Sequence, residues 1–223
     1  MPDIFDEVSE DLRAERAQEM LKKYGGLLVA AALVVLAATG GWQGWRWYQA
    51  RETARVAATY IDALRAADRP PGAERDAARP LLDQVAAAGP SGYRTLARLR
   101  EAALKADGGD MAAALALYNQ VATDSAADPL LRDLASLQWA TRQVDSGEPG
   151  LLEARLAPLT GAEHPLRALA GEAQALLAIR QGKPDAARDI LKRLSQDVTA
   201  PDGVRGRANG LLAQLGAAAG AAP

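Results

Sequence analysis

The arrangement of apolar and polar residues divides the chain into three parts. A leader of residues 1–23, rich in charged residues, is followed by a stretch from Tyr24 to Trp45 that has no charged residue. From Tyr48 onward, apolar residues recur at helical spacing in short runs that Gly, Pro and Asp separate. The abundant residues there are Ala, Leu and Arg, which are strong helix formers, and no run alternates as a strand does. The pattern predicts an all-α protein with one apolar segment near its N-terminus.

The uncharged stretch is long enough to cross a membrane as one helix. Its 22 residues would span roughly 33 Å at about 1.5 Å per residue, and a bilayer core is about 30 Å thick. Aromatic side chains gather at its far end, where amphipathic rings would lie at the level of the lipid headgroups. We therefore expect a transmembrane helix over residues 24–47. The anchoring side chains would be Leu27, Leu28, Val29, Leu33, Val34, Val35, Leu36, Trp42, Trp45 and Trp47.

Two other interpretations of this stretch are a cleaved signal peptide and a buried helix of a soluble protein. A signal peptide begins with a short basic region, whereas the leader here contains many acidic residues. A buried helix would not gather its aromatic residues at one end. Among the residues that flank the stretch, four basic residues precede it (Arg13, Arg16, Lys22 and Lys23) and three follow it (Arg46, Arg51 and Arg55), which favours a cytoplasmic leader and a repeat domain outside the cytoplasm.

The part after the stretch contains an internal repeat. Pro129, Pro165 and Pro201 are separated by 36 residues each, and Gly109, Gly147 and Gly182 fall about midway in each unit. After each glycine, residues four and then three apart form one face of a helix. These residues are Ala114, Tyr118 and Val121 in one copy, Leu152, Leu156 and Leu159 in the next, and Ala187, Leu191 and Leu194 in the last.

Each unit is predicted to be a helix, a tight turn and a second helix, and stacked neighbours would bury the apolar faces. The repeat domain would cover residues 48–216 and comprise about four hairpins and a capping helix, followed by a flexible tail at 217–223. The predicted first helices are 93–106, 130–145 and 166–181, and the second helices are 111–124, 151–159 and 184–196. An earlier pair is predicted at 53–67 and 75–88, and the capping helix at 204–215.

This pattern resembles the tetratricopeptide repeat, a helix pair of about 34 residues. The order of the parts, from the acidic leader through Lys22-Lys23-Tyr24-Gly25 and the single span to the repeats, is similar to the bacterial ancillary SecYEG translocon subunit family. The resemblance implies a single-pass inner-membrane protein with a periplasmic repeat domain. It implies as partners the translocon subunits, a membrane-anchored periplasmic chaperone and secreted client chains. An envelope scaffold for cell-division or cell-wall assembly proteins is the alternative function.

The composition argues against an enzyme. There is no cysteine and only one histidine, His164, which lies at a repeat boundary without a serine or paired acid placed beside it. We expect no cofactor and no metal site, and Asp107-Gly108-Gly109-Asp110 is interpreted as an interhelical turn with a helix cap. Acidic and basic residues balance after Trp47, so we expect no nucleic-acid partner.

Two features are candidate partner-binding sites. Arg94, Arg98, Glu101 and Lys105 share one helical stripe that would line a groove for an extended peptide, or would form a solvated face with weak ion pairs. Trp139 is the only tryptophan after Trp47, and it would serve as an anchor for a partner or as a core residue between stacked hairpins.

Overall fold

The computed structural model describes residues 4–220, and it describes side chains from Lys22 to residue 217 apart from Leu28. Every regular element in this part is helical, which confirms the all-α class. The chain divides into two compact units, the first ending at Arg55 and the second beginning at Val56. Positions 1–3 of the leader and 221–223 of the tail lie outside the described residues, as do the side chains of 4–21 and of the expected anchor Leu28.

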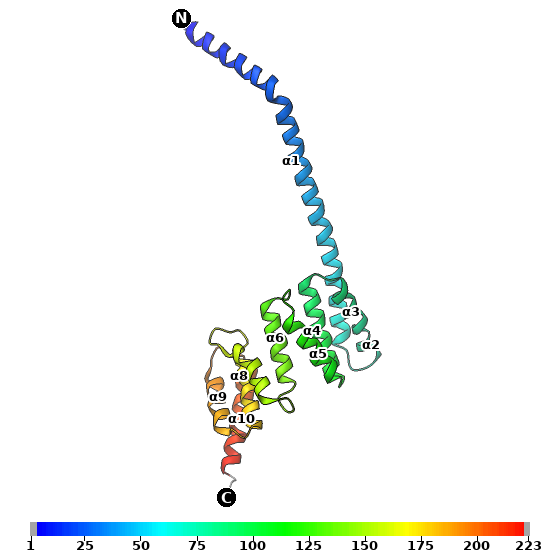
Figure 1. The fold of residues 1–223 in the computed structure, drawn as a ribbon, viewed down its shortest axis with the longest axis vertical. Helices are drawn as coiled ribbons and strands as arrows, with labels where there is room; N and C mark the ends of the chain where they lie inside the picture. Colours follow the sequence, from blue (N-terminus) through cyan, green and yellow to red (C-terminus); the bar gives the residue numbers. More distant parts are fainter. Residues whose placement is uncertain (1–3, 221–223) are drawn as a thin grey trace. The chain divides into compact units, whose positions relative to one another are not determined.

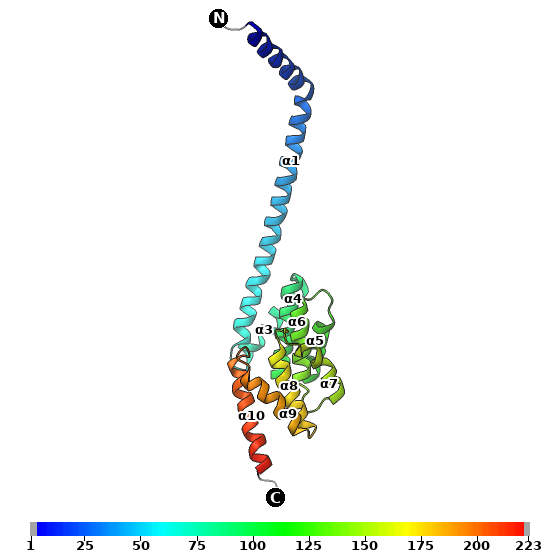
Figure 2. The same ribbon diagram turned by 90° about the vertical axis from the view of Figure 1, so that its left-hand side faces the viewer.

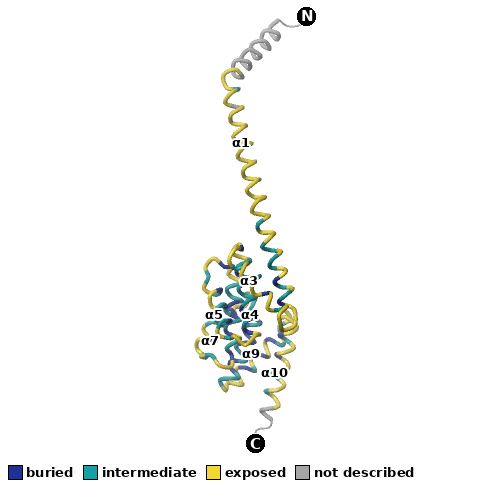
Figure 3. Tube along the Cα trace, turned by 90° about the vertical axis from the view of Figure 1, so that its right-hand side faces the viewer, coloured by how far each residue is buried: buried dark blue, intermediate teal, exposed yellow. Residues whose placement is uncertain are grey.

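The first unit lies within one helix, α1 (Ile4–Ala67). The sequence predicted a leader, a membrane helix and a separate first repeat helix, whereas α1 runs through all three regions without a break. No proline occurs between Pro2 and Pro70, so nothing removes a backbone hydrogen bond from the helix, and its internal glycines only weaken it. The apolar stretch of α1 is exposed along its length (Figure 3).

The second unit is a series of antiparallel helix pairs (Figures 1 and 2). The last turns of α1, from Val56, pack with α3 to form the first pair, and a closing helix follows the fourth pair. Four hairpins and a capping helix are therefore confirmed. The elements of this unit are α2 (Ala73–Asp76), α3 (Ala78–Ala88), α4 (Ser91–Asp107), α5 (Met111–Thr123), α6 (Pro129–Thr141), α7 (Pro149–Leu156), the 3-10 helix η1 (Ala157–Thr160), α8 (Arg167–Arg180), α9 (Pro184–Gln196) and α10 (Asp202–Gly220).

The core of this unit is a row of small apolar clusters, each of which joins neighbouring helices. One cluster joins the end of α1 to α3 and α4, and the next joins α4 to α5. A third joins α6, α7, η1 and α8, and a fourth joins α8, α9 and α10. Alanine supplies many of the contacts, so the helices approach closely, and each hairpin is stabilised by its neighbours in the series.

The predicted face of each second helix is confirmed as the buried one. Ala114, Tyr118 and Val121 of α5 are at most 2% exposed, and the corresponding residues of α7 with η1 and of α9 are also buried. These positions were predicted from spacing alone, because residues three and four apart in a helix share one face.

The first helices of two hairpins end in the same turn. Gly109 (φ +85°) and Gly182 (φ +69°) adopt the left-handed conformation that closes a Schellman motif. In each, the amide after the glycine donates to the carbonyl five residues earlier, from Asp110 to Lys105 and from Lys183 to Ala178, at 2.9 Å. The Asp110 carboxylate then accepts from the Ala113 amide at 3.2 Å, so the predicted turn with a helix cap is confirmed.

The third hairpin differs from its predicted form. Helix α6 ends at Thr141, before the predicted residue 145, and the chain continues in tight turns in which the Gln143 side chain donates to the Trp139 carbonyl at 3.1 Å. Gly147 does not share the left-handed conformation of its counterparts, and it is required for space, because a Cβ there would lie 3.0 Å from Gln143. The second helix becomes a 3-10 helix at Ala157, since Pro158 has no amide hydrogen to continue the α-helix.

The closing helix is longer than predicted. It begins at Asp202 and continues through Gly220, past residue 217 where the tail was expected to begin. The residues from 216 to 220 are all Ala or Gly, and alanine has the highest helix propensity, so the backbone continues as a helix.

Candidate functional site: a groove over helix α8

Helix α8 is the most deeply buried helix of the repeat domain, and one stripe of it forms the floor of a groove. The stripe consists of small or flexible side chains at helical spacing, namely Ala168, Gly171, Gln174, Leu177 and Ala178. The walls are α9 on one side and the end of the third hairpin on the other. Two hollows along this stripe share Gln174 and Ile190, so they adjoin each other, and together they are called the groove.

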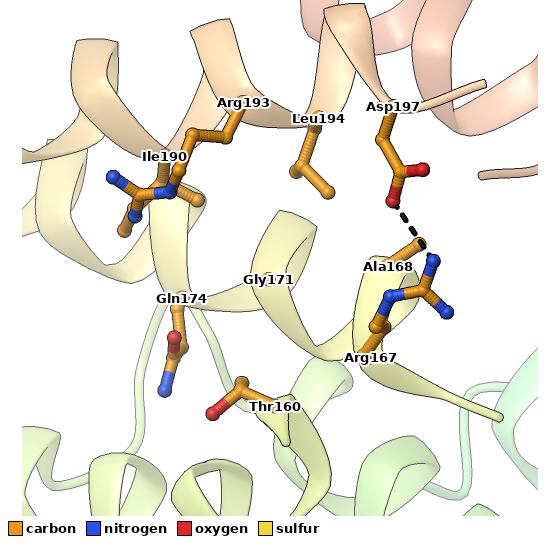
Figure 4. A pocket seen from close by; sticks show the side chains of 9 residues that line it. All are labelled: Thr160, Arg167, Ala168, Gly171, Gln174, Ile190, Arg193, Leu194 and Asp197. Carbon is orange, nitrogen blue, oxygen red and sulfur yellow. Dashed lines mark hydrogen bonds and ion pairs between the residues drawn. The ribbon is translucent and has the colours of Figure 1, made fainter. Parts of the chain in front are cut away.

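The first hollow has a volume of about 190 Å³ and lies where α8 begins and α9 ends (Figure 4). The Arg167 guanidinium bonds the Asp197 carboxylate at 3.0 Å across its end, and it also contacts the Thr199 hydroxyl. The side chain of Arg193 stands beside Ile190 at the mouth of the hollow (Figure 4). This end of the groove therefore holds one closed ion pair and one further cation.

The second hollow is larger, about 390 Å³, and mainly apolar around Leu177, Ala178 and Ile190. At its end the Gln181 amide donates to the Glu153 carboxylate at 2.8 Å. Lys183 also lines this end, at the turn that precedes α9. An extended apolar segment is the shape that such a groove would hold.

The electrostatics of the groove are uneven. The Thr199 hydroxyl and amide both donate to Asp197, and with Arg167 they hold the pKa of that carboxyl below its ordinary value. Both carboxylates that line the groove thus have partners. Arg193 and Lys183 have no hydrogen bond or ion pair from their side chains within the part of the chain that the structure describes, and neither does the Gln174 amide. The free groups are two cations and a neutral amide.

The predicted charged stripe on α4 is paired within the protein. Arg94 donates to the Gly89 carbonyl at 3.3 Å, Arg98 pairs with Asp124 at 3.3 Å, and Lys105 pairs with Glu101 at 3.6 Å. The side chains of Arg98, Glu101 and Lys105 are only 16–27% exposed. The stripe therefore connects α4 to neighbouring segments, and its role in partner binding stays a prediction.

Trp139 is half-buried between two clusters. It packs against the α4–α5 cluster on one side and the α6–α8 cluster on the other. The Arg155 guanidinium lies 4.1 Å from the centre of its ring and also contacts Asn119, and burial lowers the pKa of Arg155. Trp139 thus links the second and third hairpins, which agrees with its interpretation as a core residue. A role as an anchor for a partner stays a prediction.

The histidine has a structural role. The Nδ1 atom of His164 accepts from the Leu166 amide at 3.1 Å, and its Nε2 atom lies 3.1 Å from the Asp133 carboxylate. The imidazole therefore ties the start of α8 to α6. Among the described residues, no group of three or more His, Asp or Glu is arranged to hold a metal ion.

The expected membrane-anchor residues whose side chains the structure describes are all highly exposed. Their exposed fractions lie between 58% and 69%, and none of the residues in the apolar window is buried. Within the described range, α1 is the one helix long and apolar enough to cross a membrane. At the end of the window the Arg51 guanidinium lies 3.8 Å from the centre of the Trp47 ring.

Comparison with known proteins shows the family to which this chain belongs. The family model described as "Tetratricopeptide repeat-like domain" matches residues 18–200, which is most of the chain. The chain belongs to the tetratricopeptide repeat-like domain family. A search of curated proteins and a search of solved structures each found no match.

Tetratricopeptide repeat-like domains typically serve as protein-interaction modules, and stacked hairpins supply the extended surfaces that such modules use. The groove in this tetratricopeptide-like domain was missed by the sequence analysis, which placed the binding stripe on α4. A signal for it was present, because Ala168, Gly171, Ala175 and Ala178 recur at helical spacing on the first helix of the fourth hairpin. Nothing in the sequence indicated that other groups of the protein would pair with Asp197 and with Glu153 and leave the two cations without partners among the described residues.

Proposed function

We propose that this protein is a single-pass inner-membrane protein whose tetratricopeptide-like domain holds protein partners on the periplasmic side. The single observation that carries the proposal is the extent of the family match. It begins at residue 18 and therefore includes the apolar stretch of α1 as well as the repeats. This extent supports a retained apolar helix over a signal peptide that is removed after export.

The exposure of the apolar stretch supports a lipid surrounding. Large side chains such as Leu27 and Val34 are 69% and 68% exposed, and no charged residue occurs between Lys23 and Arg46. A continuous apolar surface of this length is unfavourable in water, and lipid would cover it. Trp42, Trp45 and Trp47 would then lie at the membrane–water interface.

We further propose that the protein is an ancillary translocon subunit that passes secreted chains to a membrane-anchored periplasmic chaperone. The similarity of its arrangement to the bacterial ancillary SecYEG translocon subunit family supports this role. The small excess of basic residues before the span supports a cytoplasmic leader. The balanced charge of the repeat domain favours protein partners over nucleic acid.

Topology is tested with reporters on the full chain. A reporter active only in the periplasm and one active only in the cytoplasm are each fused after Pro223. The proposal expects activity of the periplasmic reporter alone, in membranes that retain the protein after carbonate washing. Activity of the cytoplasmic reporter would overturn the orientation, and release of the protein by carbonate would overturn the tether.

Partners are tested by crosslinking in intact cells, followed by detergent solubilisation and mass spectrometry. An unrelated single-span protein expressed at the same level is the control. Enrichment of translocon subunits and a periplasmic chaperone over the control is the expected result. Enrichment of cell-division or cell-wall synthesis proteins in their place would contradict the translocon role and support the envelope scaffold.

A further inference from the structure

The groove over α8 has a chemistry that selects its occupant. Its floor and one wall are apolar, through Leu177, Ala178 and Ile190. Its own carboxylates both have partners: Asp197 forms an ion pair with Arg167, and Glu153, which keeps its charge, accepts a hydrogen bond from the Gln181 amide. What remains free along it are two cations, Lys183 and Arg193.

We propose that this groove binds an extended, acidic segment of a partner protein, with apolar side chains on the floor and two carboxylates on Lys183 and Arg193. The proposal rests on the proposed function only in that both assign protein binding to the repeat domain. The groove is a different surface from the charged stripe on α4, whose side chains are already paired within the protein.

The spacing of the two cations sets the length of the occupant. Lys183 precedes the first residue of α9, and Arg193 lies near the end of that helix. Ten residues of helix correspond to about 15 Å, and an extended chain covers about 3.3 Å per residue. The two carboxylates would therefore stand about four or five residues apart. The floor between them is apolar apart from Gln174, so the intervening side chains would be small or medium apolar ones.

Gln174 provides the hydrogen bonds that an extended backbone needs. It lines both hollows, and its amide has no partner within the described residues. A side-chain amide both donates and accepts, so it matches one peptide unit of an extended segment. An extended chain has no internal hydrogen bonds, and burying its peptide units without partners would be costly. Gln174 lies where the two hollows meet, in the middle of the groove.

The test uses the full-length protein in detergent micelles and a fluorescent probe peptide. The probe has two aspartates about five positions apart with leucine and alanine between them, and a second probe carries lysines in place of the aspartates. Fluorescence anisotropy at low salt should show saturable binding of the acidic probe, at least about tenfold tighter than of the basic probe. Binding should weaken as salt is added, because the cations are exposed.

Variants locate the binding surface. Lys183→Glu and Arg193→Glu should each weaken binding of the acidic probe about tenfold, and Gln174→Ala should weaken it with a smaller change in salt dependence. The matched control is Lys192→Glu, because Lys192 is an exposed lysine on the opposite side of α9 and should leave binding unchanged. Circular dichroism and the unfolding midpoint of each variant establish that the domain is intact.

Several results would overturn the proposal. Equal binding of both probes, no saturable binding of the acidic probe, or an equal loss in Lys192→Glu would each show that the groove does not select an acidic segment. These results are separate from a failure of the proposed function. Carbonate extraction or the absence of translocon partners would refute the membrane and translocon roles while leaving probe binding in micelles unchanged.

Discussion

Glu172 on α8 and Arg207 on α10 form a two-point ion pair although 35 residues separate them in the chain. The Arg207 Nε and Nη2 atoms donate to the two oxygens of Glu172 at 2.5 and 2.7 Å. Glu172 is only 8% exposed, so its charge depends on this one arginine. Other polar contacts span a similar distance in sequence, 30 residues for Arg167 with Asp197 and 32 for Arg75 with Asp107. Polar contacts about one repeat apart in the sequence thus connect the two helices of one hairpin, two neighbouring hairpins, and the last hairpin and the closing helix.

The Glu172–Arg207 pair should stabilise the end of the repeat domain. Arg207→Ala leaves a buried carboxylate without its partner, which we expect to reduce the free energy of unfolding by about 2 kcal/mol. Lys192→Ala is the control, since Lys192 is exposed and unpaired within the described part of the chain. Urea unfolding followed by circular dichroism measures both, and an equal midpoint in the two variants would refute the role of the pair.

The acid sensitivity of the repeat domain should depend on Asp197. Hydrogen bonds from Thr199, with the charge of Arg167, lower the pKa of Asp197 in the folded protein. A lowered folded-state pKa contributes stability above the unfolded-state value of about 3.9, and this contribution is lost as the pH falls through the folded-state pKa. Asp197→Asn should therefore show a smaller decrease of the urea midpoint than the natural protein between pH 5 and pH 3. Parallel pH profiles would contradict this prediction.

Two glycines should respond in opposite ways to replacement by alanine. A Cβ at Gly171 would lie 3.5 Å from Leu194, an ordinary contact, and alanine favours a helix interior. Gly171→Ala should therefore raise the free energy of unfolding by about 0.5–1 kcal/mol. Gly109 has φ +85°, where a side chain is strained, so Gly109→Ala should lower it by about 1 kcal/mol. Thermal unfolding of the two variants side by side tests the contrast, which the same sign in both would refute.

Trp139 should contribute to stability because it connects two clusters. Trp139→Ala removes a half-buried indole and the surface on which Arg155 stacks, and we expect a loss of about 2 kcal/mol. Trp47→Ala makes the same change in the first unit and should leave unfolding of the repeat domain unchanged. If Trp139→Ala retains full stability but loses its crosslinked partners, Trp139 is a partner anchor and the core interpretation is wrong.

A charge in the middle of the apolar stretch should release the protein from membranes. An arginine at the centre of a membrane helix costs about 3 kcal/mol in insertion experiments, so Val34→Arg should raise the fraction extracted by carbonate. Ala50→Arg places the same charge in α1 beyond the apolar stretch and should remain in the pellet. Quantitative immunoblotting of both fractions gives the result, and equal retention of Val34→Arg would contradict membrane insertion.

The repeat helices were predictable because their signals are local. Apolar residues three and four apart located the buried faces of α5, α7 and α9, and prolines located the starts of α6 and α10. The errors also have local causes, since the turns after Thr141 contain no residue that stops a helix as strongly as proline. The unbroken α1 was missed because charge and hydropathy change along it while its backbone continues.

The proposed binding surface could not be predicted, because it depends on contacts between side chains that are far apart in the sequence. The α4 stripe has the helical spacing expected of residues that line a groove. In the structure, however, Asp124 forms an ion pair with Arg98, and the Gly89 carbonyl accepts a hydrogen bond from Arg94. Asp197 follows Arg167 by 30 residues in the chain but lies beside it in the structure. Arg167 is therefore paired, and Arg193 is free within the described part of the chain. Helical periodicity and breaking residues act over a few positions, so the amino-acid order determined the repeat helices, their buried faces and the apolar stretch. Distances between side chains about a repeat apart in the sequence arise only when the helices pack, and this packing decided which charges are paired and where the groove opens.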